Sequence, residues 1–137
     1  MVTGIDTNVL ARYIAQDDEM QARAATAFIE QHCASGEKIF INHTVLCELV
    51  WVLKKCYKLS KLKTVAVLER IVNTSQFAFE NPQIIRQALN DYKDGSADFS
   101  DYIIGRTNQH HRCVRTVTFD RAAGKAEGFE LLATGKK

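Results

Sequence analysis

The chain has 137 residues, a length typical of one domain with its own hydrophobic core. Hydrophobic residues make up 46% and charged residues 25%, which fits a soluble globular protein and excludes a disordered chain. No segment approaches the length of a membrane span, and the net charge of +2 does not by itself indicate binding to nucleic acid. The 4 cysteines form no CxxC pair and no signal peptide is expected, so we expect free thiols and a cytoplasmic protein.

Short apolar segments alternate with helical patterns along the chain. Strands are expected at 2–5, 38–42, 76–79, 114–119 and 129–132. Helices are expected at 6–14, 17–35, 44–57, 60–72, 82–92, 98–110 and 120–126, each opening on an acid, hydroxyl or proline residue suited to a first turn. This alternation predicts one α/β domain over 1–137, with a parallel-rich sheet covered by helices.

Four acidic residues occupy unusual places in this pattern. Asp6 and Asp120 each directly follow a strand, and parallel strands present their carboxyl ends, and hence their ligands, at one edge of a sheet. Glu48 interrupts the apolar run 45–53, where burying a lone carboxylate would be costly, and Asp101 lies in the first turn of its helix. If the fold brings the four together, their mutual repulsion requires a shared cation, and oxygen ligands suit Mg²⁺ or Mn²⁺.

Each acid also has a simpler explanation. Asp6 and Asp120 could be plain N-caps, and Asp101 could form a capping box with Asp98, three residues earlier. Glu48 could be a buried protonated acid or the partner of an arginine. Taken together, the four acids favour a shared metal site over four unrelated roles, because all of them lie at or just past the end of an expected strand.

Residues 54–63 contain five lysines and no acidic residue: Lys54, Lys55, Lys58, Lys61 and Lys63. This basic segment could be a solvated helix face or a strip that attracts a phosphate backbone.

Four motifs together resemble those of the PIN-domain family, and VapC-type toxins of toxin–antitoxin pairs in particular. The first motif is Gly4-Ile5-Asp6-Thr7-Asn8-Val9-Leu10, and the second is Glu48 within its apolar helix. The third is Ala97-Asp98-Phe99-Ser100-Asp101-Tyr102-Ile103-Ile104-Gly105, and the fourth is Thr118-Phe119-Asp120-Arg121. The resemblance covers essentially the whole chain, which it identifies as a single minimal PIN domain.

The resemblance implies a three-layer α/β/α sandwich with a central, mainly parallel sheet of four to five strands. It implies a metal-dependent endoribonuclease that hydrolyses RNA phosphodiester bonds with Mg²⁺ or Mn²⁺. Asp6, Glu48, Asp101 and Asp120 match the family's catalytic, metal-binding acids, and Asp98 matches an additional acid of many such toxins. The residues that match supporting polar positions are Thr7, Asn8 and Thr118.

Further residues are expected to contact RNA or other groups. Arg12, Lys54 and Lys55 are candidates for steering RNA. Gly105-Arg106 departs from the small Ala-Ala pair common in the family, and Arg106 could contact a phosphate or a neighbouring carboxylate.

The implied partners are an RNA substrate and a cognate antitoxin, whose cationic side chain would enter the acidic groove, in a homodimer or a larger assembly. Two alternatives remain open at this point. One is a PIN-like RNA-binding or partner-binding domain without turnover, and the other is a phospho-receiver signalling domain, which also places an acidic Mg²⁺ pocket on a small α/β fold.

Overall fold

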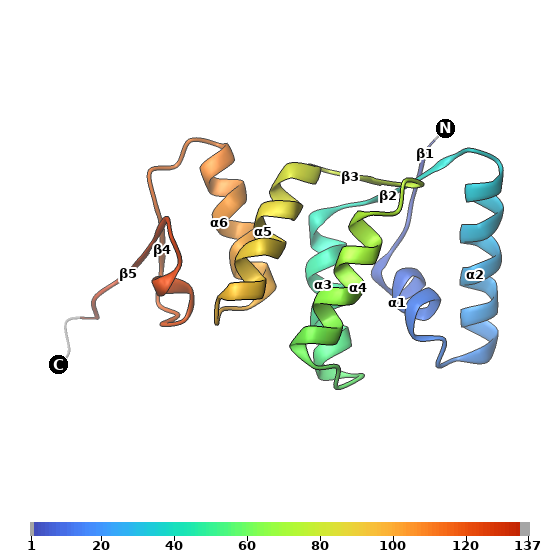
Figure 1. The fold of residues 1–137 in the computed structure, drawn as a ribbon, viewed down its shortest axis with the longest axis horizontal. Helices are drawn as coiled ribbons and strands as arrows, with labels where there is room; N and C mark the ends of the chain where they lie inside the picture. Colours follow the sequence, from blue (N-terminus) through green and yellow to red (C-terminus); the bar gives the residue numbers. More distant parts are fainter. Residues whose placement is uncertain (1, 135–137) are drawn as a thin grey trace. The chain divides into compact units, whose positions relative to one another are not determined.

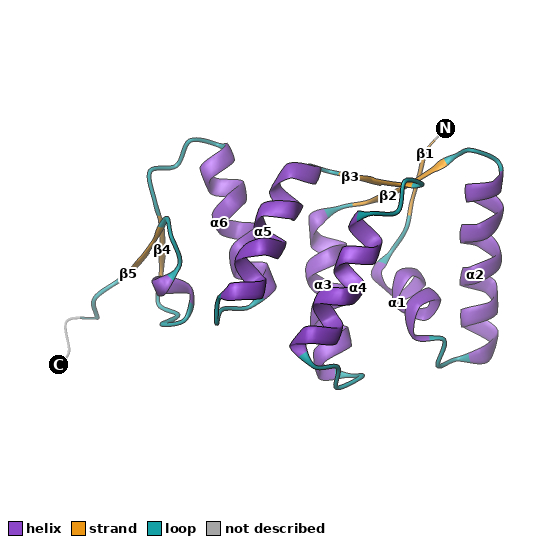
Figure 2. Ribbon diagram, viewed as in Figure 1, coloured by secondary structure: helices purple, strands orange, loops and turns teal. Residues whose placement is uncertain are grey.

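A computed structural model describes residues 2–134 of the chain (Figure 1). The chain divides into two compact units, Met1–Glu80 and Asn81–Lys137, which are described separately here. Short strands alternate with longer helices in both units (Figure 2), and every strand pair in the described residues is parallel. The α/β class and the parallel pairing expected from the sequence are confirmed.

The first unit contains a three-stranded sheet and four helices. Its strands are β1 (Val2–Gly4), β2 (Lys38–Ile41) and β3 (Phe77–Phe79), in the order β1-β2-β3. Its helices are α1 (Thr7–Ala15), α2 (Glu19–Ala34), α3 (His43–Lys55) and α4 (Lys61–Val72). The side chains of Ile39, Ile41, Leu46, Leu49 and Leu68 have no exposed surface and form the centre of the core between sheet and helices.

Polar residues start the helices of this unit. Asp6, Asp18 and Ser60 are N-caps, as the sequence predicted, and each accepts a hydrogen bond from a backbone N–H of its own helix. The predicted cap at Thr44 is wrong. Asn42 caps α3 instead, accepting from the Val45 N–H at 2.8 Å, because strand β2 ends one residue earlier than expected.

The second unit packs two helices together and adds a small C-terminal sheet. It contains α5 (Pro82–Asp94), α6 (Phe99–His110), β4 (Thr116–Thr118), a 3₁₀ turn η1 (Ala123–Lys125) and β5 (Phe129–Leu131). Strand β4 pairs with β5. The helix expected at 120–126 is shorter than predicted. Only the 3₁₀ turn η1 forms there, and Gly124, a poor helix former, lies at its centre.

A glycine lets the C-terminal sheet approach α6 closely. A Cβ atom placed on Gly105 would lie 2.4 Å from Cε1 of Phe129, so a larger residue would push the ring away. Gly105, which stands where the family commonly has alanine, therefore has a packing role in this chain.

Candidate active site

In the first unit, Thr7 links two of the predicted acids. Asp6 lies two residues after the end of β1 and caps α1, and its Oδ1 accepts from the backbone N–H of Thr7 at 2.7 Å. The hydroxyl of Thr7, which is buried, donates to Oε1 of Glu48 at 2.6 Å. Two acids 42 residues apart in sequence are therefore joined to the same residue, and Thr7 has the supporting position expected of it.

Glu48 itself is exposed, which corrects the expectation that it lies in an apolar environment. Its neighbours Leu46 and Leu49 are fully buried, and Glu48 projects from another face of α3. The carboxylate needs neither protonation nor an arginine partner to be tolerated there. Its partner is the Thr7 hydroxyl, and the remaining oxygen lone pairs are compatible with a ligand role.

A hollow of about 470 Å³ lies beside Asp6 in this unit, and Asn8, Arg12 and Phe28 contribute to its wall. Arg12 has several partners inside the unit. Its Nη1 donates to both oxygens of Asp17 at 2.9 Å and to the Tyr57 hydroxyl at 3.0 Å, and its Nε donates to Gln21 at 2.7 Å. These contacts fix the guanidinium within the same hollow as Asp6, and contact with RNA stays a prediction.

In the second unit, Asp98 and Asp101 start α6. The backbone N–H of Asp98 donates to Oδ2 of Asp101 at 3.2 Å, which is half of the capping box that the sequence suggested. Burial raises the pKa of Asp101, and the negative charges of Asp120 and Asp98 raise it further, while the hydrogen bond from Asp98 lowers it. The charges of Asp98 and Asp120 both act on Asp101. The two residues that start α6 therefore also belong to a group of acids that includes Asp120.

Asp120 is held in a turn after β4. Its backbone N–H donates to the hydroxyl of Thr118 at 3.0 Å, and its Oδ1 accepts from the N–H of Ala122 at 2.8 Å. Thr118 therefore supports Asp120, as Thr7 supports Glu48.

The basic candidates differ in their surroundings. Lys54 and Lys55 lie in the last turn of α3, where Lys55 is exposed and Lys54 half-buried. Arg106 donates from Nε and Nη2 to the two oxygens of Asp91, at 2.7 and 2.8 Å. Of the two roles suggested for Arg106, the structure shows contact with a carboxylate, and contact with a phosphate stays a prediction. The sequence does not indicate that Asp91 on α5 is the partner of Arg106.

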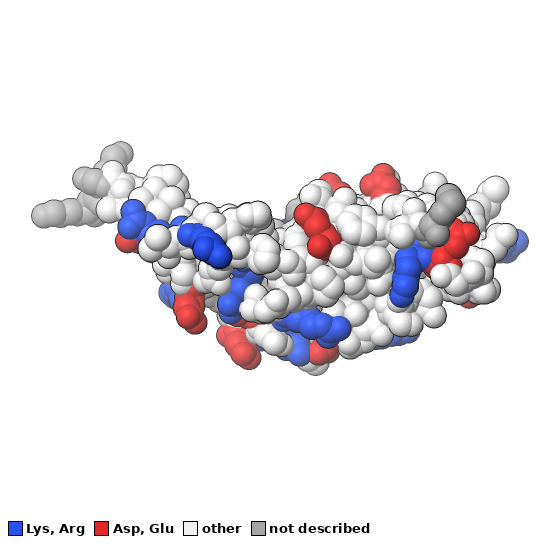
Figure 3. Space-filling view, turned by 90° about the horizontal axis from the view of Figure 1, so that it is seen from above, with Lys and Arg blue, Asp and Glu red and all other residues white. Residues whose placement is uncertain are grey.

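Figure 3 shows Lys and Arg side chains as well as Asp and Glu side chains among mostly uncharged residues. In the described residues of each unit taken alone, no three His, Cys, Asp or Glu side chains are grouped as a metal site. The acids instead form two sets, Asp6 with Glu48 and Asp98 with Asp101 and Asp120. All their donor atoms are oxygens, which is the chemistry that Mg²⁺ and Mn²⁺ prefer.

Comparison with known proteins identifies the class. The PIN domain model matches residues 5–128, a span that crosses both units and contains all the acids discussed above. The chain therefore belongs to the PIN-domain family. Within that family it is similar to a VapC ribonuclease of Aquifex aeolicus (strain VF5), with 31% identity over 128 residues that cover 93% of each chain. The resemblance to VapC-type proteins seen in the motifs is confirmed. No helix in the described residues is long and apolar enough to cross a membrane.

Proposed function

We propose that this chain is a divalent-metal-dependent endoribonuclease, the toxin of a VapBC-type pair, and that it hydrolyses phosphodiester bonds of RNA. The observation that supports this most is the link through Thr7, whose backbone N–H donates to Asp6 and whose buried hydroxyl donates to Glu48. Family membership and the similarity to a VapC ribonuclease support the choice of RNA as substrate.

The donor set fits a divalent cation. Asp6, Glu48, Asp101 and Asp120 offer only oxygen ligands, with Asp98 as an additional acid. The pKa of Asp101 is raised mainly by burial and further by the negative charges of Asp120 and Asp98, and a bound cation would oppose both effects. We propose that these acids hold the cation and that residues 1–137 form one PIN domain. The bound ion would act as a Lewis acid towards a phosphoryl oxygen and lower the pKa of water.

The chain's own residues would orient the reactants. Glu48, which accepts a hydrogen bond from the Thr7 hydroxyl, would orient the attacking water or hold a second ion. Asp120 would be oriented by its hydrogen bonds with Thr118 and Ala122. In-line attack of water on phosphorus would break the bond to the 3′ oxygen and leave a 5′-phosphate and a 3′-hydroxyl. Lys54 and Lys55 would attract the RNA backbone.

The test is cleavage by the Asp6→Asn variant of the full chain. Asparagine still caps a helix, so the fold of α1 is expected to survive while the charged ligand is lost. Asp18→Asn is the matched control, because Asp18 caps α2 by a similar hydrogen bond and belongs to neither acidic set. We expect Asp18→Asn to cleave RNA with Mn²⁺ or Mg²⁺ at the unmodified rate, and Asp6→Asn to show at least a hundredfold loss. A folded Asp6→Asn protein with full activity would refute the proposal.

The partners follow from the same proposal. The acidic groove would accept a cationic side chain of a cognate antitoxin, which would compete with the metal, and the protein would act in the cytoplasm as a homodimer or a larger toxin–antitoxin assembly. Expression of the protein with and without the product of the neighbouring gene, followed by mapping of new RNA 5′ ends, tests this. RNA ends that are unchanged by the neighbour's presence would contradict the antitoxin assignment.

A further inference from the structure

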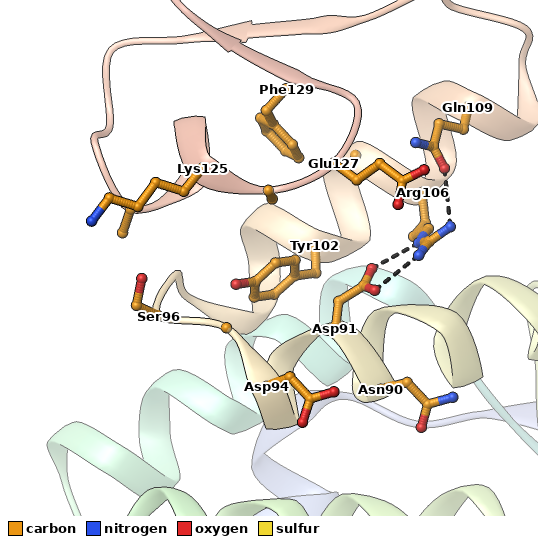
Figure 4. Close-up of a pocket in the computed structure, with 14 residues that line it drawn as sticks. Asn90, Asp91, Asp94, Ser96, Tyr102, Arg106, Gln109, Lys125, Glu127 and Phe129 are labelled. Atoms are coloured by element: carbon orange, nitrogen blue, oxygen red, sulfur yellow. Dashed lines mark hydrogen bonds and ion pairs between the residues drawn. The ribbon is translucent and has the colours of Figure 1, made fainter.

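The second unit contains a hollow of about 500 Å³ bordered by α5, α6 and the segment from η1 to β5 (Figure 4). This volume is within the range of about 300–1,000 Å³ that is common for small-molecule sites. The ring of Phe129 and the side chain of Tyr102 lie between its two ends in Figure 4. Lys125 and Ser96 lie at one end, and Arg106 and Glu127 at the other.

The wall of this hollow is built from the same segments as the acidic set Asp98, Asp101 and Asp120. Ala122, which lines the hollow, donates its N–H to Oδ1 of Asp120 at 2.8 Å. Tyr102, another wall residue, directly follows Asp101 on α6, and its hydroxyl accepts from the N–H of Ala97 at 3.2 Å. A nucleotide bound at the acids would therefore have the hollow as its immediate neighbour.

The polar groups of the hollow include donors, such as Lys125, as well as acceptors. Arg106 and Asp91 are committed to each other through two hydrogen bonds, so their charges largely cancel. Two further carboxylates, Asp94 and Glu127, line the hollow and are exposed. An ionised carboxylate only accepts hydrogen bonds, so these two groups suit a ligand that presents N–H donors.

We propose that this hollow binds an unpaired RNA base that carries an amino group, next to the bond that is cut. Single-stranded RNA is commonly recognised through bases that turn out of the strand, pack on aromatic side chains and are read along their edges. The ring of Phe129, which is half-buried, provides the apolar surface, and Glu127 accepts from the amino group. Guanine, adenine and cytosine carry such a group, whereas uracil does not. This inference names a substrate preference for the proposed ribonuclease and rests on that function.

Binding is tested without cleavage. The Asp6→Asn full chain, with EDTA, is titrated with the four ribonucleoside 5′-monophosphates while backbone amide resonances are followed by NMR. We expect shifts at 94–96, 102–109 and 125–129, with GMP, AMP and CMP binding at least threefold more tightly than UMP. Because no metal or turnover is required, this result does not depend on whether the nuclease assignment is correct.

Glu127→Gln is the informative variant, since the amide replaces one acceptor oxygen by a donor on an exposed side chain that the fold does not need. Glu130→Gln is the matched control: Glu130 is also exposed and nearby, but pairs with Arg115 and does not line the hollow. We expect Glu127→Gln to reduce the preference over UMP at least threefold and Glu130→Gln to leave it unchanged. Equal binding of UMP, shifts confined to other parts of the chain, or an unaltered preference in Glu127→Gln would each overturn the inference.

A second readout uses the active protein. Cut sites mapped on a random RNA pool should show an amino-bearing base at one fixed position relative to the cut, and Glu127→Gln should flatten that preference. If cleavage occurs without any such preference, the base site is refuted while the ribonuclease assignment stands. If the chain binds these bases but cuts no RNA, the ribonuclease assignment is refuted while the base site stands.

Discussion

The hydrogen bond between Thr7 and Glu48 can be measured by a double-mutant cycle of Thr7→Val and Glu48→Ala. Valine keeps the shape of threonine but removes the hydroxyl that donates to Glu48 at 2.6 Å. A hydrogen bond to a charged group contributes about 1.5–3 kcal/mol, and the exposure of Glu48 places the expected coupling near the lower end, at about 1–2 kcal/mol. For a chain of this size, that coupling corresponds to roughly 3–8 °C in Tm.

The assay is urea unfolding of the four proteins in EDTA, so that no metal contributes to the free energy of unfolding. Thr74→Val replaces Thr7→Val in a control cycle, because the Thr74 hydroxyl donates to the carbonyl of Arg70 rather than to Glu48. We expect the control cycle to be additive. A coupling below about 0.3 kcal/mol for Thr7 and Glu48, within the usual error of additivity, would refute the role of Thr7 in holding Glu48.

Three further predictions concern packing and protonation. Gly105→Ala should lower the free energy of unfolding by about 1–3 kcal/mol, because the new methyl group meets Phe129, and unchanged urea unfolding would contradict this. Burial raises the pKa of the Cys47 thiol to about 11, so roughly one molecule in a thousand is thiolate at pH 8, and Cys47 should react with a disulfide reagent far more slowly than exposed Cys56. Equal rates would count against this. Since the pKa of Asp101 is raised, the folded state holds more protons than the unfolded state between the ordinary and the raised pKa. In EDTA, stability should therefore fall as the pH rises through that window, and Asp101→Asn, followed by urea unfolding at several pH values, should remove the slope; an equal slope in the variant would refute the raised pKa of Asp101.

Local signals in the sequence were sufficient for most of the fold. Helix starts at Asp6, Asp18, Ser60 and Asp98 could be predicted because a capping side chain acts on its own helix, within three residues of its position. The start of α3 was misplaced because both Asn42 and Thr44 can cap, and only pairing of β2 with its neighbours decides where the strand ends.

The environment of Glu48 was inferred incorrectly from composition alone. Counting apolar neighbours suggested burial, but a helix turns by about 100° per residue, so positions two before and two after Glu48 point away from it. The buried residues Leu46 and Val50 occupy those positions. The helical period, applied to this segment, would have placed the carboxylate on another face of the helix.

Long-range contacts could not be predicted from the sequence. Asp91 and Arg106 are 15 residues apart on two packed helices, and nothing near either residue indicates the other. The contact of Thr7 with Glu48 is also long-range, and only the family resemblance suggested that the two residues belong to one site. The base-binding hollow combines residues of α5, α6 and the C-terminal segment, so it is visible only once the unit is folded.

The central claim is that the predicted acids bind a divalent cation, and Mn²⁺ binding followed by electron paramagnetic resonance tests it most directly. The unmodified chain, Asp6→Asn and Asp101→Asn are titrated with Mn²⁺, with Asp18→Asn as the control. We predict that Asp6→Asn and Asp101→Asn each weaken binding at least tenfold, because each removes a charged ligand, while Asp18→Asn binds like the unmodified chain. Unchanged Mn²⁺ affinity in either Asp6→Asn or Asp101→Asn would contradict the assignment of that residue as a metal ligand.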